Sequence, residues 1–169
     1  MINYQKIGIQ VIVMQIRPAA DRDIPGMLSL LHQVGEVHHV IRPDIFRDGA
    51  LKYDASALSE LLKDETKPIF VADRDGFVAG YCFCQIKKTE GSTVLTDRTE
   101  LYIDDLCVDE TCRGQGIATL LYAHVTDFAK ALGCGFITLN VWCGNESAMK
   151  FYEKAGMTAR NIHMEMKLC

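Results

Sequence analysis

The spacing of hydrophobic residues along the chain predicts an alternation of strands and helices. Ile9 to Arg17 mixes β-branched residues with partial alternation and stops at Pro18, which predicts a first strand. Apolar residues then recur at helical spacing after Asp21, which we expect to cap a helix that runs to about Val34. Residues 36–52 show no clean period, so a loop with a short helix is expected there.

The middle of the chain combines one helix with the strands of a hairpin. The segment Asp73–Gly76 lies between two apolar runs and ends in the glycine that tight turns between antiparallel strands favour. The expected elements are a helix over Ala55–Leu62, strands over Ile69–Ala72, Phe77–Ile86 and Glu100–Val108, and a polar turn over Thr89–Arg98. This part of the chain therefore predicts two antiparallel strands followed by a third strand.

The last third of the chain returns to helices alternating with strands. The expected elements are a long amphipathic helix over Ile117–Ala129 that ends at Gly133, a strand over Phe136–Trp142, a helix over Asn145–Ala155, and a final strand or hairpin over Met157–Leu168. Together with the elements before them, they predict the α/β class, with a mixed sheet that carries helices on both faces.

Composition adds a size and several exclusions. Hydrophobic residues make up 49% and charged residues 24% of the 169 residues, which is ordinary for one globular domain over residues 1–169. The net charge of -4 argues against a nucleic-acid partner and against attraction to an anionic membrane. No apolar stretch reaches the roughly 20 residues of a membrane helix, and residues 1–13 do not resemble a signal peptide. Seven cysteines without Cys-x-x-Cys spacing indicate a reduced, cytoplasmic protein.

A turn rich in glycine separates the strand that ends at Val108 from the helix that begins near Ile117. Gly114 and Gly116 lie directly before this helix, and Arg113 precedes them. The first turn of a helix leaves about four backbone N–H groups without internal partners, and the helix dipole adds positive charge, so an anion such as a diphosphate binds there. A tight turn that needs glycine for its shape alone is the alternative interpretation.

Three motifs, in the same order, resemble those of the GNAT superfamily of N-acetyltransferases. The sequence Arg113-x-x-Gly116-x-Ala118 is similar to the coenzyme A signature of that family. The preceding segment Tyr102–Val108 resembles its fourth strand, and Asn145–Met157 resembles its late helix. The resemblance extends loosely over nearly the whole chain.

The resemblance implies a fold, a cofactor and an activity. The fold would be a central mixed, mostly antiparallel sheet with helices on both faces, whose fourth and fifth strands splay apart around the pantetheine arm of acetyl-CoA. Residues 1–13 would extend the first strand. The activity would be direct transfer of an acetyl group to a primary amine of a small molecule or peptide in a ternary complex, and many relatives pair as homodimers. The residues expected to bind the coenzyme are Leu106, Cys107, Val108, Arg113, Gly114, Gln115, Gly116, Ile117, Ala118, Asn145, Ala148, Phe151 and Tyr152.

Acetyl transfer needs an acid for the departing thiolate and a base for the attacking ammonium. Tyr152 matches the family tyrosine that faces the sulfur, so we expect it to be the general acid; the alternative is an aromatic residue on the buried face of a helix. The candidate bases on the fourth strand are Glu100, Asp104 and Asp105, of which Asp104 resembles a carboxylate of aminoglycoside acetyltransferases. Strand alternation predicts that only one of the two aspartates faces the cleft unless a bulge intervenes. The catalytic set is therefore expected to contain Tyr152, Asp104 and Glu100, with a solvated acidic strand end as the alternative.

Five further positions give weaker signals. Asn145 is expected to contact the pantetheine arm or to cap its helix. Asn140 stands where ribosomal-protein N-terminal acetyltransferases carry a glutamate base, which puts that substrate class in doubt. His38 and His39 lack a third ligand at suitable spacing, so no metal site is expected. Cys107 raises the idea of an acyl-cysteine intermediate, but no histidine lies near it in sequence to activate the thiol.

Two other classes of function compete with the enzyme. A non-catalytic acyl-CoA-binding or sensor module on the same fold would bind the coenzyme without releasing its thiol to amines. A nucleotide-binding protein would use the glycine turn as a phosphate site, but the sequence has neither Gly-Lys-Ser/Thr nor Gly-x-Gly-x-x-Gly. The identity of the acceptor amine does not follow from the sequence.

Overall fold

The computed structural model describes residues 14–168, which divide after Leu139 into two compact units. The segment before Met14, with its expected extension of the first strand, lies outside the described residues. The elements of the first unit are β1 (Met14–Pro18), η1 (Asp21–Asp23), α1 (Ile24–Ile41), α2 (Ala55–Leu61), β2 (Ile69–Arg74), β3 (Phe77–Thr89), β4 (Arg98–Val108), η2 (Glu110–Cys112), α3 (Ile117–Ala131) and β5 (Phe136–Leu139). The described part of the second unit contains one helix, α4 (Glu146–Lys154).

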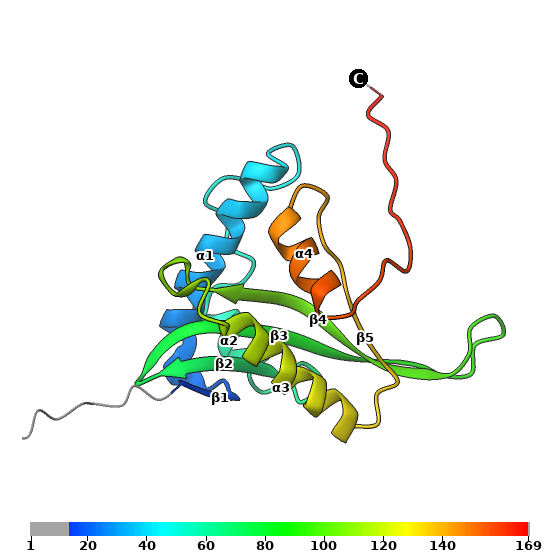
Figure 1. Cartoon of the computed structure of the whole chain (residues 1–169), viewed down its shortest axis with the longest axis horizontal. Coiled ribbons are helices and arrows are strands. Elements are labelled where there is room, and N and C mark those ends of the chain that lie inside the picture. The colour runs from blue at the N-terminus through cyan, green and yellow to red at the C-terminus, as the bar shows by residue number, and fades with distance from the viewer. Residues whose placement is uncertain (1–13, 169) are drawn as a thin grey trace, which may run out of the picture. The chain divides into compact units, whose positions relative to one another are not determined.

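The strands of the first unit form one sheet in the order β1-β2-β3-β4-β5 (Figure 1). Neighbours pair antiparallel except β4 and β5, which run parallel. Parallel neighbours require a crossover connection, and α3 supplies it. The predicted mixed, mostly antiparallel sheet is therefore confirmed, although β5 ends at Leu139 and not at the expected Trp142.

Helices cover both faces of this sheet, as Figure 1 shows, so the unit has two hydrophobic cores. Because side chains alternate along a strand, successive residues of Ile69–Ala72 in β2 and of Tyr81–Cys84 in β3 enter opposite cores. The side covered by α1 and α2, the α1 face, buries Met27, Leu30, Leu31, Leu58, Ile69, Val71, Val78, Tyr81, Phe83 and Cys107. The side covered by α3, the α3 face, buries Phe70, Ala72, Ala79, Cys82, Cys84, Leu101, Ile103, Cys112, Ile117, Leu121, Val125 and Ala129.

The first long helix begins and ends later than the sequence pattern predicts. Asp21 lies in the short helix η1 and does not cap α1, because Asp23 occupies the N-cap position. The helix then continues to Ile41, so the irregular segment expected from residue 36 begins at Arg42. Arg42 leaves the helical conformation because it precedes Pro43, whose ring disfavours that conformation in the residue before it.

The second unit begins its helix where the sequence predicts and then departs from the prediction. The Asn145 side chain accepts a hydrogen bond from the Ala148 N–H at 3.2 Å and so caps α4. Residues 155–168 contain no strand, so the expected final strand or hairpin over Met157–Leu168 is wrong. A strand forms only where its backbone pairs with a neighbour. The alternating apolar residues are between 78% and 83% exposed; they are Ile162, Met164, Met166 and Leu168.

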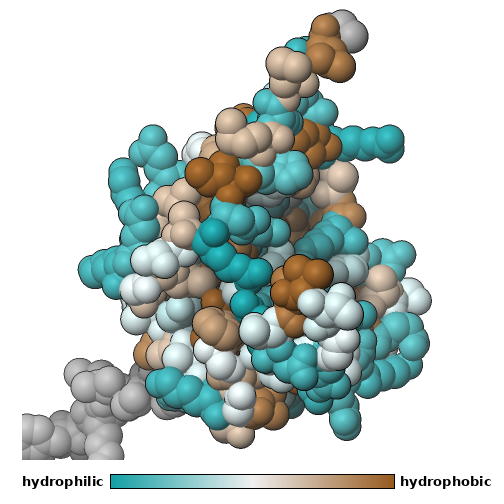
Figure 2. All heavy atoms as spheres, turned by 90° about the vertical axis from the view of Figure 1, so that its right-hand side faces the viewer, coloured by the Kyte–Doolittle hydropathy of each residue, from teal (hydrophilic) through white to brown (hydrophobic). Residues whose placement is uncertain are grey.

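The described surface mixes hydrophilic and hydrophobic side chains, as the face drawn in Figure 2 shows. Large apolar residues are exposed at several separate places in the sequence, such as Val40 on α1 and Val94 in the turn between β3 and β4. Within residues 14–168, none of the helices combines the length and the hydropathy that a bilayer-spanning segment requires.

Candidate active site

The turn between β4 and α3 holds a row of backbone N–H groups that have no acceptor in the described part of the chain. Gly114 and Gly116 have φ angles of 76° and 80°, a left-handed conformation that glycine adopts at low steric cost. Gly116 is the N-cap of α3. Within residues 14–168, no acceptor receives a hydrogen bond from the amides of residues 114–119. Amides of this kind at a helix N-terminus bind anions, and we call them the amide cradle.

The space around the amide cradle suits a diphosphate. A Cβ atom added at Gly114 or Gly116 would meet no described atom within 4 Å, so this side of the turn is open. Arg113 is exposed beside it, and its Nε donates to the Val108 carbonyl oxygen at 3.3 Å. The positive φ angles require glycine with or without a ligand, so only the amides that lack an acceptor among residues 14–168 point to a ligand. Their donors fit the diphosphate of the coenzyme that the resemblance implies.

Only part of β4 lies between two strands. Glu100–Ile103 pairs with Phe136–Leu139 of β5, and in the described part of the chain no strand flanks Asp104–Val108 on that side. The Asp109 N–H donates to a β3 carbonyl oxygen at 3.0 Å, so alternation along the strand turns the Val108 N–H away from β3. The open half of β4 (Asp104–Val108) leads directly toward the amide cradle, and its separation from β5 agrees with the splayed strands that the resemblance implies.

A β-bulge in β4 places two aspartates on the same face of the sheet. Phe83 pairs with Asp105 while Cys84 pairs with Ile103, so Asp104 is an extra residue without a partner on β3. A bulge breaks the alternation of side chains between the two faces. The expected separation of Asp104 and Asp105 onto opposite faces therefore does not occur, and both carboxyl groups lie on the α1 face.

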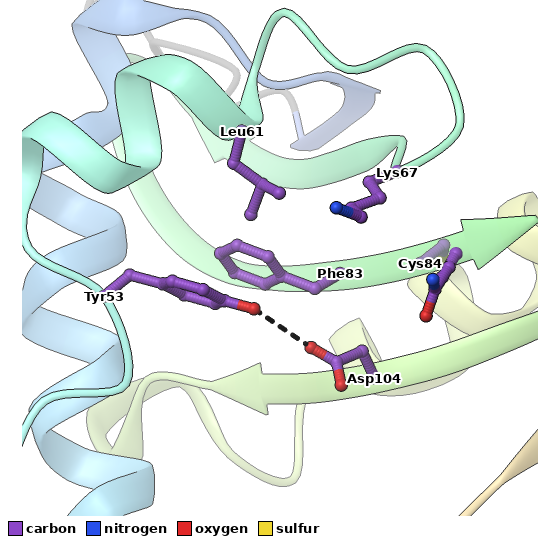
Figure 3. A pocket seen from close by; sticks show the side chains of 7 residues that line it. Tyr53, Leu61, Lys67, Phe83, Cys84 and Asp104 are labelled. Carbon is purple, nitrogen blue, oxygen red and sulfur yellow. Dashed lines mark hydrogen bonds between the residues drawn. The ribbon is translucent and has the colours of Figure 1, made fainter.

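Asp104 lines a pocket of about 170 Å³ on the α1 face (Figure 3). Its Oδ2 accepts a hydrogen bond from Lys52 Nζ at 2.6 Å and a longer one from the Tyr53 hydroxyl at 3.5 Å. Burial alone would lower the pKa of Lys52, but the hydrogen bond and charge of Asp104 outweigh burial and raise it. The pocket therefore holds a carboxylate that already binds an ammonium group. Its other lining residues are Leu61, Lys67, Phe83, Cys84 and Gln85.

Asp105 is half-buried beside Tyr81, whose hydroxyl donates to Asp105 Oδ2 at 2.9 Å. Burial raises the pKa of Asp105 to about 6, and the hydrogen bond from Tyr81 and the charge of Lys52 oppose this rise only in part. The negative charge of Asp104 acts in the same direction as burial. A carboxyl group with a pKa near 6 is ionised at neutral pH and accepts a proton readily, as a general base must.

Two further side chains of β4 are engaged within the protein. Glu100 forms an ion pair with Arg98 and accepts a hydrogen bond from the Thr138 hydroxyl at 3.2 Å. Cys107 is buried, and burial raises the pKa of its thiol to about 12. A thiol with that pKa stays protonated at neutral pH, which disfavours an acyl-cysteine intermediate.

The end of α1 and the loop after it border Lys52. His38 stacks on Phe46 with 4.9 Å between ring centroids, and His39 Nδ1 lies 2.7 Å from the Phe46 carbonyl oxygen. Burial, and then the charge of Lys52, lowers the pKa of His38. Both histidines therefore contact Phe46, which lies in the loop that leads to Lys52.

The remaining predicted site residues belong to the second unit. Asn145 caps α4, which confirms the capping interpretation. Phe151 and Tyr152 are half-buried on the same helix, with 5.1 Å between their ring centroids. Their contacts with the coenzyme, and those of Asn145 and Ala148, stay a prediction. The first unit by itself brings together the amide cradle, the open half of β4 and the two aspartates of the bulge.

The match to a family profile shows which protein family the chain belongs to. The profile described as the acetyltransferase (GNAT) family matches residues 34–157. The chain belongs to the GNAT family. The match spans both units, from within α1 to just beyond α4. Membership supports acetyl transfer as the general activity of this GNAT chain and confirms the resemblance inferred from the motifs.

Individual relatives agree with the family assignment. The chain is 39% identical over 88 residues to N-alpha-acetyltransferase 30 of Schizosaccharomyces pombe, covering 52% of this chain and 55% of that protein. It resembles a solved mutant of the BH1408 protein from Bacillus halodurans, with a TM-score of 0.88, 32% identity, and coverage of 92% of this chain and 100% of the other. Aminoglycoside N-acetyltransferase AAC(6')-Iy, solved in complex with CoA, shares the fold with a TM-score of 0.68, 17% identity, and coverage of 95% and 99%. The chain spans about half the length of the first curated relatives it matches.

Sequence reasoning missed part of the acceptor side of this site. Lys52 lies in the segment that showed no period, and nothing nearby in sequence links it to Asp104. The contact of Tyr81 with Asp105 was also missed, because it depends on the pairing of β3 with β4. The signal available in the sequence was the adjacent pair of aspartates, which a bulge is able to turn to one side.

Proposed function

We propose that this GNAT chain is an acetyl-CoA-dependent N-acetyltransferase that acetylates a primary amine. The observation that carries the proposal is the amide cradle of residues 114–119, which follows the open half of β4 in the chain. Backbone donors rarely lack partners in a folded protein unless water or a ligand takes their hydrogen bonds. A diphosphate and an extended pantetheine arm would satisfy both features, and the solved complex of AAC(6')-Iy with CoA supports the same coenzyme on this fold.

The proposed donor contacts fall into two groups. Gly114–Ala118 would hold the diphosphate through backbone N–H groups, and Arg113 would add positive charge beside them. The backbone of Leu106–Val108 would pair with the extended pantetheine arm as an added strand does. Acetyl-CoA bound there supplies an activated thioester acyl group. The Val108 N–H would stabilise the negative charge that develops on the acyl oxygen, a contribution of about 3 kcal/mol for such a donor.

On the acceptor side we assign the base to Asp105 and ammonium binding to Asp104. Asp104 already binds the Lys52 ammonium, so an acceptor amine would compete with Lys52 for this carboxylate. Asp105, with a pKa of about 6, would take the proton that the amine must lose before it attacks. Glu100, which is held by Arg98, stays a second candidate base.

The departing thiolate requires a proton, and we assign its donor to Tyr152. A phenol with an ordinary pKa of about 10 is protonated at neutral pH and is acidic enough to donate to a thiolate. Transfer would be direct, since the raised pKa of Cys107 disfavours a covalent step on that thiol. The acceptor amine belongs to a small molecule or a peptide, and we further propose a cytoplasmic homodimer.

The proposal is tested by thiol release from acetyl-CoA in the presence of a panel of amines, with CoA binding measured separately by calorimetry. We expect CoA to bind and thiol release to depend on one class of amine. Binding of CoA without amine-dependent thiol release would support the non-catalytic acyl-CoA module instead. Failure to bind CoA would overturn both the proposed acetyltransferase and the non-catalytic acyl-CoA module.

A further inference from the structure

One side chain of α1 fixes the start of the connection between β4 and α3. Gln33 uses both polar atoms of its amide: Nε2 donates to Asp109 Oδ2 at 2.9 Å, and Oε1 accepts from the Glu110 N–H at 3.0 Å. A carboxylate only accepts and an N–H only donates, so the two partners also fix the orientation of the amide. We call this pair of bonds the Gln33 clamp. It joins residues 76 and 77 positions apart in the sequence.

Asp109, the main partner of the clamp, organises the corner after β4. It is buried, and its Oδ1 accepts a hydrogen bond from the Thr111 N–H at 3.0 Å. The hydrogen bond from the Thr111 hydroxyl, opposed by burial and assisted by Gln33, holds the pKa of Asp109 below its ordinary value. The Asp109 carbonyl oxygen receives the Cys112 N–H at 2.8 Å, which closes η2. The corner after β4 is therefore held together by its own hydrogen bonds, and the Gln33 clamp joins this corner to α1.

The first residues of the amide cradle, 114–116, are exposed and have few contacts that fix their direction, whereas Ile117 packs in the core of the α3 face. Gly114 and Gly116 have no side chains, and the Arg113 N–H makes only a long bond of 3.4 Å to the Glu110 carbonyl oxygen. At the far end, Arg74 of β2 donates to Gln115 Oε1 at 3.2 Å in an exposed position. Of the two bonds of the Gln33 clamp, the one to Asp109 is partly buried and the one from the Glu110 N–H is exposed, so the loss of the bond to Asp109 should cost more than the loss of an exposed bond.

We propose that Gln33 is a positioning residue for the diphosphate site: by holding Asp109 and Glu110 against α1, it sets the direction of the amides of residues 114–116. This inference rests on the proposed function, because its main consequence is the affinity for coenzyme A. Gln33 acts through the corner after β4 and needs no contact with the coenzyme itself.

The test replaces Gln33 with methionine, which has a similar length and removes both bonds. We expect the affinity for CoA, measured by calorimetry, to fall about tenfold. In the absence of CoA, hydrogen–deuterium exchange of the peptide covering residues 109–119 should be faster than in the unaltered chain. KM for acetyl-CoA should rise by the same factor as the CoA dissociation constant, with KM for the amine unchanged. Glu36→Ala, on an exposed position of α1, is the matched control and should change none of these quantities.

A second variant keeps the test decisive if the methionine variant folds poorly. In Gln33→Glu, an oxygen still accepts from the Glu110 N–H, but an ionised carboxylate faces Asp109. Lowering the pH protonates the new carboxyl group, which then donates to Asp109 as the amide did. The CoA affinity of this variant, relative to the unaltered chain, should therefore recover as the pH falls.

The outcomes separate this inference from the proposed function. Unchanged CoA affinity and unchanged exchange in a folded Gln33→Met chain overturn the inference and leave the function standing. For Gln33→Glu, a loss of affinity that is the same at every pH also overturns it, because a purely structural role predicts that result. Failure of the unaltered chain to bind CoA overturns the proposed function instead.

Discussion

The two halves of β4 share one strand but differ in their surroundings. Glu100–Ile103 lies between β3 and β5, whereas Asp104–Val108 has a strand neighbour on one side among the described residues. In the first half, the carboxylate of Glu100 is matched by Arg98 on the same strand. In the second half, the bulge turns Asp104 and Asp105 to one face, and a tyrosine hydroxyl is the hydrogen-bonding side chain next to Asp105.

The difference indicates that the proposed chemistry lies where regular pairing stops. A strand with two neighbours uses its backbone groups within the sheet, so only its side chains are available. A strand with one neighbour presents backbone N–H groups to a ligand, and a bulge aims two successive side chains at the same place. The closed half therefore serves as scaffold, and the open half supplies the proposed contacts.

The largest expected effect comes from removing the proposed base in the open half. Asp105→Asn keeps an acceptor for the Tyr81 hydroxyl but cannot take a proton, so kcat/KM should fall about a hundredfold or more. In the unaltered chain, kcat/KM should also fall as the pH drops below about 6, where Asp105 becomes protonated. Initial rates across pH measure both. If Glu100→Gln loses the activity and Asp105→Asn keeps it, the assignment of roles to the two halves is reversed.

The same substitution should stabilise the fold. The pKa of Asp105 rises from 3.8 to about 6 on folding, so the folded chain binds more protons than the unfolded chain between those values. Its contribution to stability is therefore complete below pH 3.8 and declines as the pH rises to about 6. At neutral pH, Asp105→Asn should raise the free energy of unfolding by about 1 to 3 kcal/mol, measured by urea denaturation.

Substitution of Tyr152 tests whether the side chains of β4 are sufficient for proton transfer. Tyr152→Phe removes the proposed acid and should lower kcat by about ten- to a hundredfold while CoA affinity stays within twofold. The measurement is kcat across pH together with calorimetric CoA binding. Turnover that is unchanged at every pH would remove Tyr152 from the mechanism and leave proton transfer to the first unit.

Two matched glycines distinguish the loss of a ligand contact at the amide cradle from the effect of backbone strain alone. Gly116 and Gly133 both have left-handed φ angles, 80° and 72°, and a Cβ atom on either would meet no described atom within 4 Å. Alanine at either position should therefore cost about 1 kcal/mol of stability. Only Gly116→Ala should weaken CoA binding, about tenfold, because its Cβ would enter the proposed diphosphate site. Equal CoA affinity in the two variants would argue against that site.

The smallest effect is expected from Lys52, the built-in partner of Asp104. Lys52→Met should lower KM for the amine about two- to fivefold, since it frees a carboxylate from a partly exposed ion pair. The charge of Lys52 lowers the pKa of Asp105, so the acid limb of kcat/KM should move to higher pH in this variant. Lys63→Met, which removes the exposed ion pair with Glu60, is the matched control. A rise in KM would mean that Lys52 assists the acceptor.

Most elements of the fold could be predicted from hydrophobic periodicity and caps. The hairpin of β2 and β3, the helix α3 and the Asn145 cap all follow from residues close together in the chain. The prediction was wrong for residues 157–168, which form no strand and whose alternating apolar side chains are exposed. It also missed the last two turns of α1, where the apolar period fades although nothing stops the helix before Pro43.

The sequence by itself determined the family, the glycine turn before α3 and the presence of acidic residues on β4, because each depends on residues that are neighbours in the chain. The tertiary structure decided that Asp104 and Asp105 share a face, that Lys52 reaches Asp104, and that Gln33 holds the corner after β4. Strand register, burial and contacts between distant segments set these features. They depend on how the whole chain packs, and so do the raised pKa of Asp105 and its proposed role.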